Sequence, residues 1–298
     1  MNGVVQSGSL TTVLELNMIT AKNYAAQAER DLNKYSAYLN HDRRPRDANL
    51  VLNVSKSIGK AVKFMLPMNG IILDDSWRVC DQTELRLPFP DITLEFDTDG
   101  LSDESEDMGA DDVIVTKWVV FLAEEPGKIA IIVCPSIGGR FKCMSRIGAL
   151  NTTKHVDIGS DSFYLSEQAF LREPARDEPD VENEIKVLRS MGAIVLGFLG
   201  MLSCKNVEQS THQKVSPKNA QRVKSHKLPI YETKILTLKP TVAQVSGIVS
   251  GLGSHASKRQ HLRRGHIRRL ESGNIWVNSC VVGDASKGVI NKQYKMAV

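Results

Sequence analysis

Two apolar runs in the first half of the chain constrain its fold most strongly. Residues 117–122 (Lys-Trp-Val-Val-Phe-Leu) and 128–133 (Lys-Ile-Ala-Ile-Ile-Val) are rich in β-branched and aromatic residues, and they flank Glu-Glu-Pro-Gly. This turn chemistry between two such runs predicts a β-hairpin. Because both runs are apolar at successive positions, both faces of the hairpin are expected to be covered. The centre of the fold is therefore predicted to be a sheet packed beneath helices.

Helices are expected before and after this β-rich stretch. Apolar residues at helical spacing predict helices over residues 11–39 and 48–65. A third helix is predicted over 181–203, with Glu182 and Glu184 in its first turn, where the helix dipole favours acids. Further short strands are expected at 71–73, 92–96, 113–115 and 230–239. We predict an α+β fold with N-terminal helices packed on a mainly antiparallel sheet, and a small basic β-rich C-terminal module.

Composition and cysteine usage indicate a soluble intracellular protein. The chain has 298 residues, of which 42% are hydrophobic and 24% charged. Its longest apolar run, residues 191–202, is shorter than the roughly 20 residues that cross a membrane, so a core helix is expected and no membrane partner. Five dispersed cysteines without a C-x-x-C pair predict reduced thiols. No basic residue precedes Lys22, which argues against a signal peptide. We expect a cytoplasmic protein.

Charge is distributed very unevenly along the chain. The formal net charge is +4, yet residues 205–298 hold 17 Lys and Arg against 4 Asp and Glu. This division predicts an acidic α+β body (1–204), a basic linker or arm (205–229) and a basic β-rich module (230–298). Such a split favours a polyanionic partner, or contact between the two parts of the chain.

The most basic segment lies near the C-terminus, where six of the twelve residues from 258 to 269 are Lys or Arg. The mutual repulsion of these cations is relieved when a polyanion binds and releases its condensed counterions. A hairpin is expected over 266–270 and 274–282, followed by a last strand over 289–296. The residues predicted to bind nucleic acid are Lys258, Arg259, Arg263, Arg264, Arg268 and Arg269, with Trp276 and Tyr294 placed to stack on bases. The alternative is a solvated ribbon, or one whose arginines pair with acids of the body.

Three histidines among these arginines allow a second hypothesis. His255, His261 and His266 could supply the general acid and base of a nuclease that works without metal, with arginines stabilising the phosphate. A zinc site from these histidines and Cys280 is not favoured, because the spacings match no familiar ligand set. Neither a metal nor a cofactor is expected, and no complete enzyme motif occurs, so the sequence leans away from an enzyme without deciding the question.

An acidic segment balances the basic one. Residues 91–112 contain ten Asp or Glu and no Lys or Arg. The segment lacks the ligand spacing of an EF-hand. It is interpreted as a solvated loop, as a surface that mimics nucleic acid and occupies a host protein's basic groove, or as an internal cover for the basic tail. The residues proposed for partner binding or masking are Asp97, Asp99, Asp103, Glu104, Glu106 and Asp107.

The C-terminal order of residues resembles the ending of a family of uncharacterised phage and prophage proteins. The matching residues are His255-Ala-Ser-Lys-Arg259, His261-x-Arg263-Arg264-Gly265-His266-x-Arg268, Trp276-Val277, Val282-Gly283-Asp284 and Tyr294. The resemblance implies a phage origin and action in the host cytoplasm. It implies no activity, so no catalytic role is transferred.

Three functional hypotheses follow. The first is a phage-type cytoplasmic accessory protein that binds nucleic acid through its Arg/His-rich C-terminal module, with RNA favoured and the choice between RNA and DNA left open. The second is a non-enzymatic inhibitor that binds a host or anti-phage defence protein. The third is a metal-independent nuclease. The partner is thus expected to be nucleic acid or a host protein, and self-association into a homo-oligomer is left open.

Overall fold

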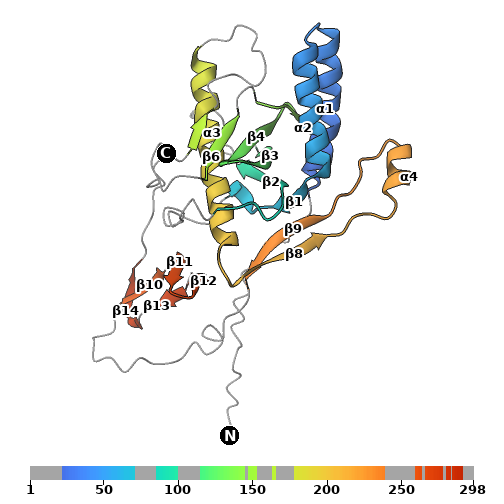
Figure 1. Ribbon diagram of the computed structural model, residues 1–298. Helices are drawn as coiled ribbons and strands as arrows, with labels where there is room; N and C mark the ends of the chain where they lie inside the picture. The colour runs from blue at the N-terminus through green and yellow to red at the C-terminus, as the bar shows by residue number, and fades with distance from the viewer. Residues whose placement is uncertain are drawn as a thin grey trace, which may run out of the picture.

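The computed structural model shows helices on both sides of a central sheet (Figure 1). It describes residues 22–70, 85–99, 115–144, 147–152, 163–165, 178–238, 259–263, 266–277, 280–282 and 284–290. The α+β prediction is confirmed. Residues 11–21 of the first expected helix, the strand at 71–73 and residues 113 and 114 lie outside these ranges. Within the ranges, that helix begins only at Tyr24, since Lys22 and Asn23 are not helical and Asn23 has a positive φ of 54°.

One sheet of nine strands forms the centre of the described part of the chain, in the order β7-β6-β4-β3-β2-β1-β9-β8, with β5 paired to β4. Its strands are β1 (Val62–Met65), β2 (Asp91–Asp99), β3 (Val115–Glu125), β4 (Lys128–Ile137), β5 (Arg140–Phe141), β6 (Gly148–Asn151), β7 (Phe163–Leu165), β8 (Val207–Gln213) and β9 (Thr233–Leu238). Strand β1 runs parallel to β2 and to β9, whereas the other pairs are antiparallel. The sheet is therefore mainly antiparallel, as predicted.

Both faces of the sheet are covered, as the apolar hairpin predicts. Along β3, Val119 and Phe121 pack with the helices α1 (Tyr24–His41) and α2 (Pro45–Lys60), while Val120 and Leu122 pack with α3 (Glu178–Leu202). The alternation follows from the pleat, which sends successive side chains to opposite faces. Each fully buried Leu, Ile or Phe contributes roughly 1.5–3 kcal/mol, so these two cores hold the three layers together.

The second helix ends earlier than its sequence pattern suggests. The pattern predicts a helix as far as Met65, but α2 ends at Lys60 and residues 62–65 form β1. The prediction is wrong here because β1 is stabilised by two parallel partners that are distant in sequence, β2 and β9. The apolar spacing of a helix continues through Val62. This spacing contains no information about backbone hydrogen bonds to strands that are distant in sequence.

The helix expected over 181–203 is confirmed, but α3 begins three residues earlier, at Glu178, so Glu182 and Glu184 lie beyond its first turn. By length and composition its stretch Glu184–Leu202 could cross a membrane, but 56% of that stretch is buried inside the protein. Leu188, Val195 and Phe198 are fully buried against the sheet. The ring of Phe198 meets that of Phe64 edge-on, with 5.1 Å between centroids. The contacts are those of a core helix.

The interval expected as a linker or arm contains regular structure. Strand β8 and helix α4 (Asn219–Lys224) lie in it, and β8 pairs with β9 in the main sheet. Figure 1 shows β8 and β9 continuing away from the sheet into an arm that carries α4. Strand β9, which the sequence assigns to the start of the basic module, thus belongs to the body.

The rest of the basic tail forms two small sheets within the described ranges. One joins β10 (Arg259–Arg263), β13 (Cys280–Val282) and β14 (Asp284–Ile290), and the other is the hairpin of β11 (His266–Leu270) and β12 (Gly273–Val277). The β11–β12 hairpin confirms the turn predicted between residues 270 and 274. The strand expected over 274–282 is instead divided into β12 and β13, and β13 pairs with β10 in the other sheet. The last strand, expected over 289–296, begins earlier, at Asp284, and the residues after Ile290 lie outside the described part.

Candidate functional site

A row of polar side chains interrupts the apolar layer between the sheet and the helix pair α1–α2. Thr93, Glu95 and Asp97 occupy alternate positions of β2 and are all buried. Beside them on β1 lies Lys63, also buried and in register with Thr93. Buried charges are expensive unless they are paired or hydrogen-bonded, so this row must have a specific role.

Glu95 caps the start of α1 from a neighbouring layer. Its carboxylate accepts backbone hydrogen bonds from Tyr24 (2.8 Å) and Ala25 (3.2 Å), the first residues of the helix. These amides would otherwise lack a partner, because the preceding Asn23 provides no side-chain cap. Burial raises the pKa of Glu95, while the two backbone hydrogen bonds and the charge of Lys63 act in the opposite direction. A negative group at this position also complements the helix dipole.

Lys63 performs the reciprocal task at the end of α2. Its Nζ donates to the carbonyl oxygens of Gly59 (2.7 Å) and Ala61 (2.6 Å). Burial lowers the pKa of Lys63 from 10.5 to about 8, and the charges of Glu95 and Glu29 oppose this shift. The first turn of α1 and the last turn of α2 are therefore held to adjacent strands by charges of opposite sign.

Replacing Lys63 by methionine is expected to change how stability depends on pH. Between pH 8 and 10.5 the native state binds fewer protons at Lys63 than the unfolded chain does. The unfolding free energy of the natural protein should therefore rise, relative to Lys63→Met, as the pH increases through this window. The relative gain is at most about 3 kcal/mol. Urea unfolding of both proteins at a series of pH values measures it, and parallel curves would contradict the assignment.

The same cluster anchors the arm. The Tyr231 hydroxyl donates to the Glu29 carboxylate, and its ring lies 4.0 Å from Lys63 Nζ. Asn23 donates through Nδ2 to the carbonyl oxygen of Pro229 (2.9 Å). Gly59 permits this arrangement, because a Cβ there would lie 2.9 Å from the Glu29 carboxylate. Burial and the neighbouring Glu29 raise the pKa of Tyr231, so it remains a donor.

The basic β11–β12 hairpin is docked on the end of α3. Ile267 is buried in the core beneath α3, and the half-buried Trp276 packs against the same core. The Asn206 side chain brackets the Trp276 backbone, donating to its carbonyl (2.8 Å) and accepting from its N–H (2.7 Å). The N–H of Lys205 donates to the carbonyl of Asn274 (3.0 Å). The hairpin is thus fixed to the body.

The predicted nucleic-acid residues are spread over several elements. Arg268 is exposed on β11, on the opposite side from Ile267. Arg259 and Arg263 belong to β10 and Arg269 to β11, whereas Lys258, Arg264 and Tyr294 lie outside the described residues. Trp276 is half-buried and packs against the core, so only part of its ring is accessible for stacking on bases. Nucleic-acid binding by these residues stays a prediction.

The predicted catalytic histidines that the structure describes lie on separate elements, and their joint role stays a prediction. His261 lies in β10 and His266 begins β11, in different small sheets, and His255 is outside the described ranges. Among the described residues no group of three or more His, Cys, Asp or Glu could hold a metal ion. Cys280, considered above as a ligand, begins β13.

The acidic segment starts inside the core. Asp97 is buried on β2 and forms an ion pair with Lys22, and Asp99 ends that strand. Asp103, Glu104, Glu106 and Asp107 fall outside the described residues, so their role in binding or masking stays a prediction. Glu95 itself was not predicted to have a role. A signal for its burial was nevertheless present, because Ile92, Leu94 and Phe96 alternate with Thr93, Glu95 and Asp97 around the strand predicted over residues 92–96.

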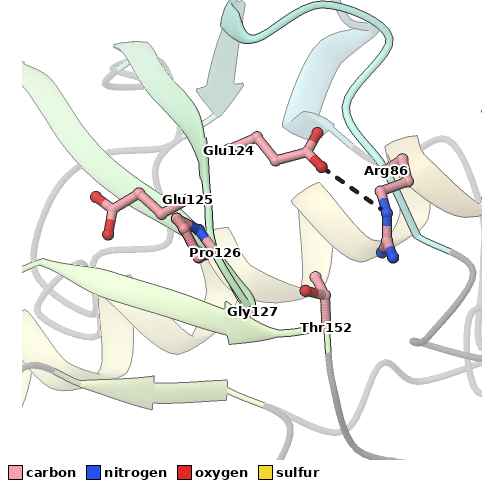
Figure 2. Close-up of a pocket in the computed structure, with 6 residues that line it drawn as sticks. All are labelled: Arg86, Glu124, Glu125, Pro126, Gly127 and Thr152. Carbon is pink, nitrogen blue, oxygen red and sulfur yellow. Dashed lines mark ion pairs between the residues drawn. The ribbon is translucent and has the colours of Figure 1, made fainter.

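A hollow of about 330 Å³ lies at the turn between β3 and β4. Figure 2 shows Glu124 pointing toward Arg86, 3.8 Å away, while Glu125 points aside. The described residues that line it are Arg86, Glu124, Glu125, Pro126, Gly127 and Thr152. Its acids pair with neighbouring cations, Glu124 with Arg86 and Glu125 with Lys128 (2.9 Å), and the lining shows no nucleophile placed beside a base.

The comparison with known families defines the class of protein. Residues 74–284 match an anti-CRISPR family, which places the chain among phage proteins that counter a bacterial defence system. The family is AcrVA2-like, the anti-CRISPR type V subtype A2 family, and the chain belongs to it because the match covers more than half of its length. No curated protein and no solved structure matches the chain. The phage-type resemblance is thereby confirmed at this coarser level, whereas the C-terminal motif as a family signature stays a prediction.

Proposed function

We propose that this protein inhibits a type V CRISPR system in the host cytoplasm by binding one of its protein components, without catalysing a reaction. The observation that supports this most strongly is the family match over residues 74–284. The described structure is consistent with a binding role, because its buried charges fix helices rather than face a substrate cleft. This is the second of the three hypotheses drawn from the sequence.

The basic tail supports a second candidate function, nucleic-acid binding. Ile267 anchors the β11–β12 hairpin while Arg268 on the same strand faces solvent, so the docked hairpin presents a cation outward. Guide RNA and target DNA are integral parts of CRISPR effector complexes, so either the protein or the nucleic acid of such a complex could be the point of contact.

A phage-restriction assay combined with affinity capture tests both candidates. Expression of the protein in cells with a type V system is expected to restore plaque formation to the level of cells that lack the system. Unchanged restriction would contradict the proposed function.

Capture with a tagged protein from the same cells is then performed with and without RNase and DNase. A defence protein retained after nuclease treatment supports direct protein binding. Its loss after nuclease treatment, together with weaker capture by a variant in which Arg263, Arg264, Arg268 and Arg269 are all alanine, supports the second candidate.

A further inference from the structure

The arm of residues 207–238 is a separate basic surface. Its base is fixed to the body by the pairing of β9 with β1 and by Tyr231 and Asn23. Its outer part is held by its own contacts. Asn219 donates to the carbonyl of Ile230 (2.9 Å) and accepts from its N–H (2.8 Å), and Arg222 Nε donates to the carbonyl of Leu228 (2.9 Å). The arm is thus an internally ordered projection (Figure 1).

The outer part of the arm carries cations without counter-charges. Between Glu208 and Glu232 the chain has five Lys or Arg, two His and no acidic residue. Its exposed basic side chains are Lys214, Lys218, Lys224, Lys227, His212 and His226. Within the part of the chain that the structure describes, none of these four lysines forms an ion pair. Cations gathered on one projection without counter-charges favour binding of a polyanion.

The composition of the arm distinguishes between nucleic acid and protein as its partner. Protein–protein interfaces are depleted in lysine and enriched in aromatic residues. The outer part of the arm, residues 209–230, shows the opposite pattern, with four lysines and no Phe, Tyr or Trp, while Tyr231 lies at its base. The chain turns back at α4, so Lys214 and Lys218 before it and Lys224 and Lys227 at its end or after it surround the outer end of the projection.

The position of the arm supports the same partner. Strand β8 begins directly after Lys205 and Asn206, the residues that hold β12. The arm and the β11–β12 hairpin therefore start from the same end of α3. Two basic surfaces, the arm and the hairpin that presents Arg268, thus begin at one point of the fold.

We propose that the arm binds the phosphodiester backbone of a nucleic acid through Lys214, Lys218, Lys224 and Lys227. Lysine contributes point charges to phosphates, and such contacts position a nucleic acid without reading its sequence. The proposal goes beyond the proposed function and does not depend on it, since the arm can bind nucleic acid whether or not the protein inhibits a CRISPR system.

The test is fluorescence anisotropy with a labelled single-stranded RNA, the DNA of the same sequence, and their duplexes, across salt from about 50 to about 200 mM. The arm variant replaces Lys214, Lys218, Lys224 and Lys227 by Gln. The matched control removes the same charge from exposed lysines of the body, Lys34, Lys56, Lys60 and Lys142. The two variants are also made in the chain in which the four tail arginines are alanine, so that tail binding cannot hide the effect.

The arm variant is expected to bind about tenfold more weakly than the control. Its salt slope should be less negative by about 0.7 for each phosphate of a single strand that the variant no longer neutralises. RNA and DNA should be affected alike if the backbone alone is bound. Equal affinity and slope for the arm variant and the control would overturn the proposal. A second result would also overturn it: neither RNA nor DNA binds, but a poly-glutamate peptide binds and its binding depends on the arm lysines. The partner of the arm would then be an acidic protein.

Discussion

Replacing Glu95 by alanine is expected to lower the free energy of unfolding by about 3–5 kcal/mol, measured by urea denaturation at neutral pH. The substitution removes the acceptor of the buried amides of Tyr24 and Ala25 at the start of α1. It also removes the acidic group whose charge stabilises protonated Lys63, so that this buried lysine is left with less compensation for its loss of hydration. Both losses leave polar groups unsatisfied in the interior, and the cost of such groups exceeds the net value of a typical hydrogen bond.

Thr93 provides the matched control for this prediction. It lies in the same buried row, two residues away on β2, but its hydroxyl has no hydrogen-bond partner among the described residues. Thr93→Val replaces that hydroxyl by a methyl group of similar size, so it should be neutral or slightly stabilising. If Glu95→Ala were as stable as Thr93→Val, the cap on α1 would not be what holds the helix to the sheet.

Local sequence signals predicted the elements whose partners are close in sequence. The β3–β4 hairpin has turn residues between two continuous apolar runs, and the β11–β12 hairpin has Gly273 at a positive φ of 114° beside its turn. Turn chemistry restricts such pairs to a few geometries, so the pairing could be predicted without knowledge of the rest of the fold.

Elements stabilised by distant partners were predicted less well. Strand β8 (Val-Glu-Gln-Ser-Thr-His-Gln) is polar and largely exposed because it forms the edge of the sheet, so it has none of the alternation that marks a strand. Polar edges of this kind discourage pairing with other chains. The prediction for β1 was wrong for the opposite reason, because its apolar residues fit a helix and a strand equally well. Only pairing with β2 and β9 favours the strand.

The candidate sites show the same division. A surplus of cations is a local property of the sequence, so the basic surfaces of the tail and of residues 205–229 could be predicted by counting charges. A count of charges does not distinguish among the acids from Asp91 to Asp112. The pleat of β2, however, buries the side chains of Glu95 and Asp97 under α1. The docking of the tail was also missed, because Ile267 and Trp276 contact a core formed by residues far away in sequence.

Undocking the β11–β12 hairpin is the second large effect that we expect. Asn206→Ala removes two short hydrogen bonds to the Trp276 backbone, at a cost of about 1–1.5 kcal/mol each. Ile267→Ala leaves a cavity in the core and costs about 2–4 kcal/mol. The combined loss of free energy should exceed the free energy that keeps so small an element docked. Local opening should then speed hydrogen exchange of the amides of residues 266–277 more than that of the amides of β3 and β4.

Arg268→Ala is the control for this prediction, because its exposed side chain lies on the other face of β11 and contributes nothing to the docking contacts. Its exchange rates should equal those of the natural protein. Unchanged protection in the double variant would show that the hairpin is held by contacts other than those of Asn206 and Ile267. The double variant also relates structure to function: if the arm and the docked hairpin bind one polyanion together, undocking should weaken nucleic-acid binding although every lysine and arginine is retained.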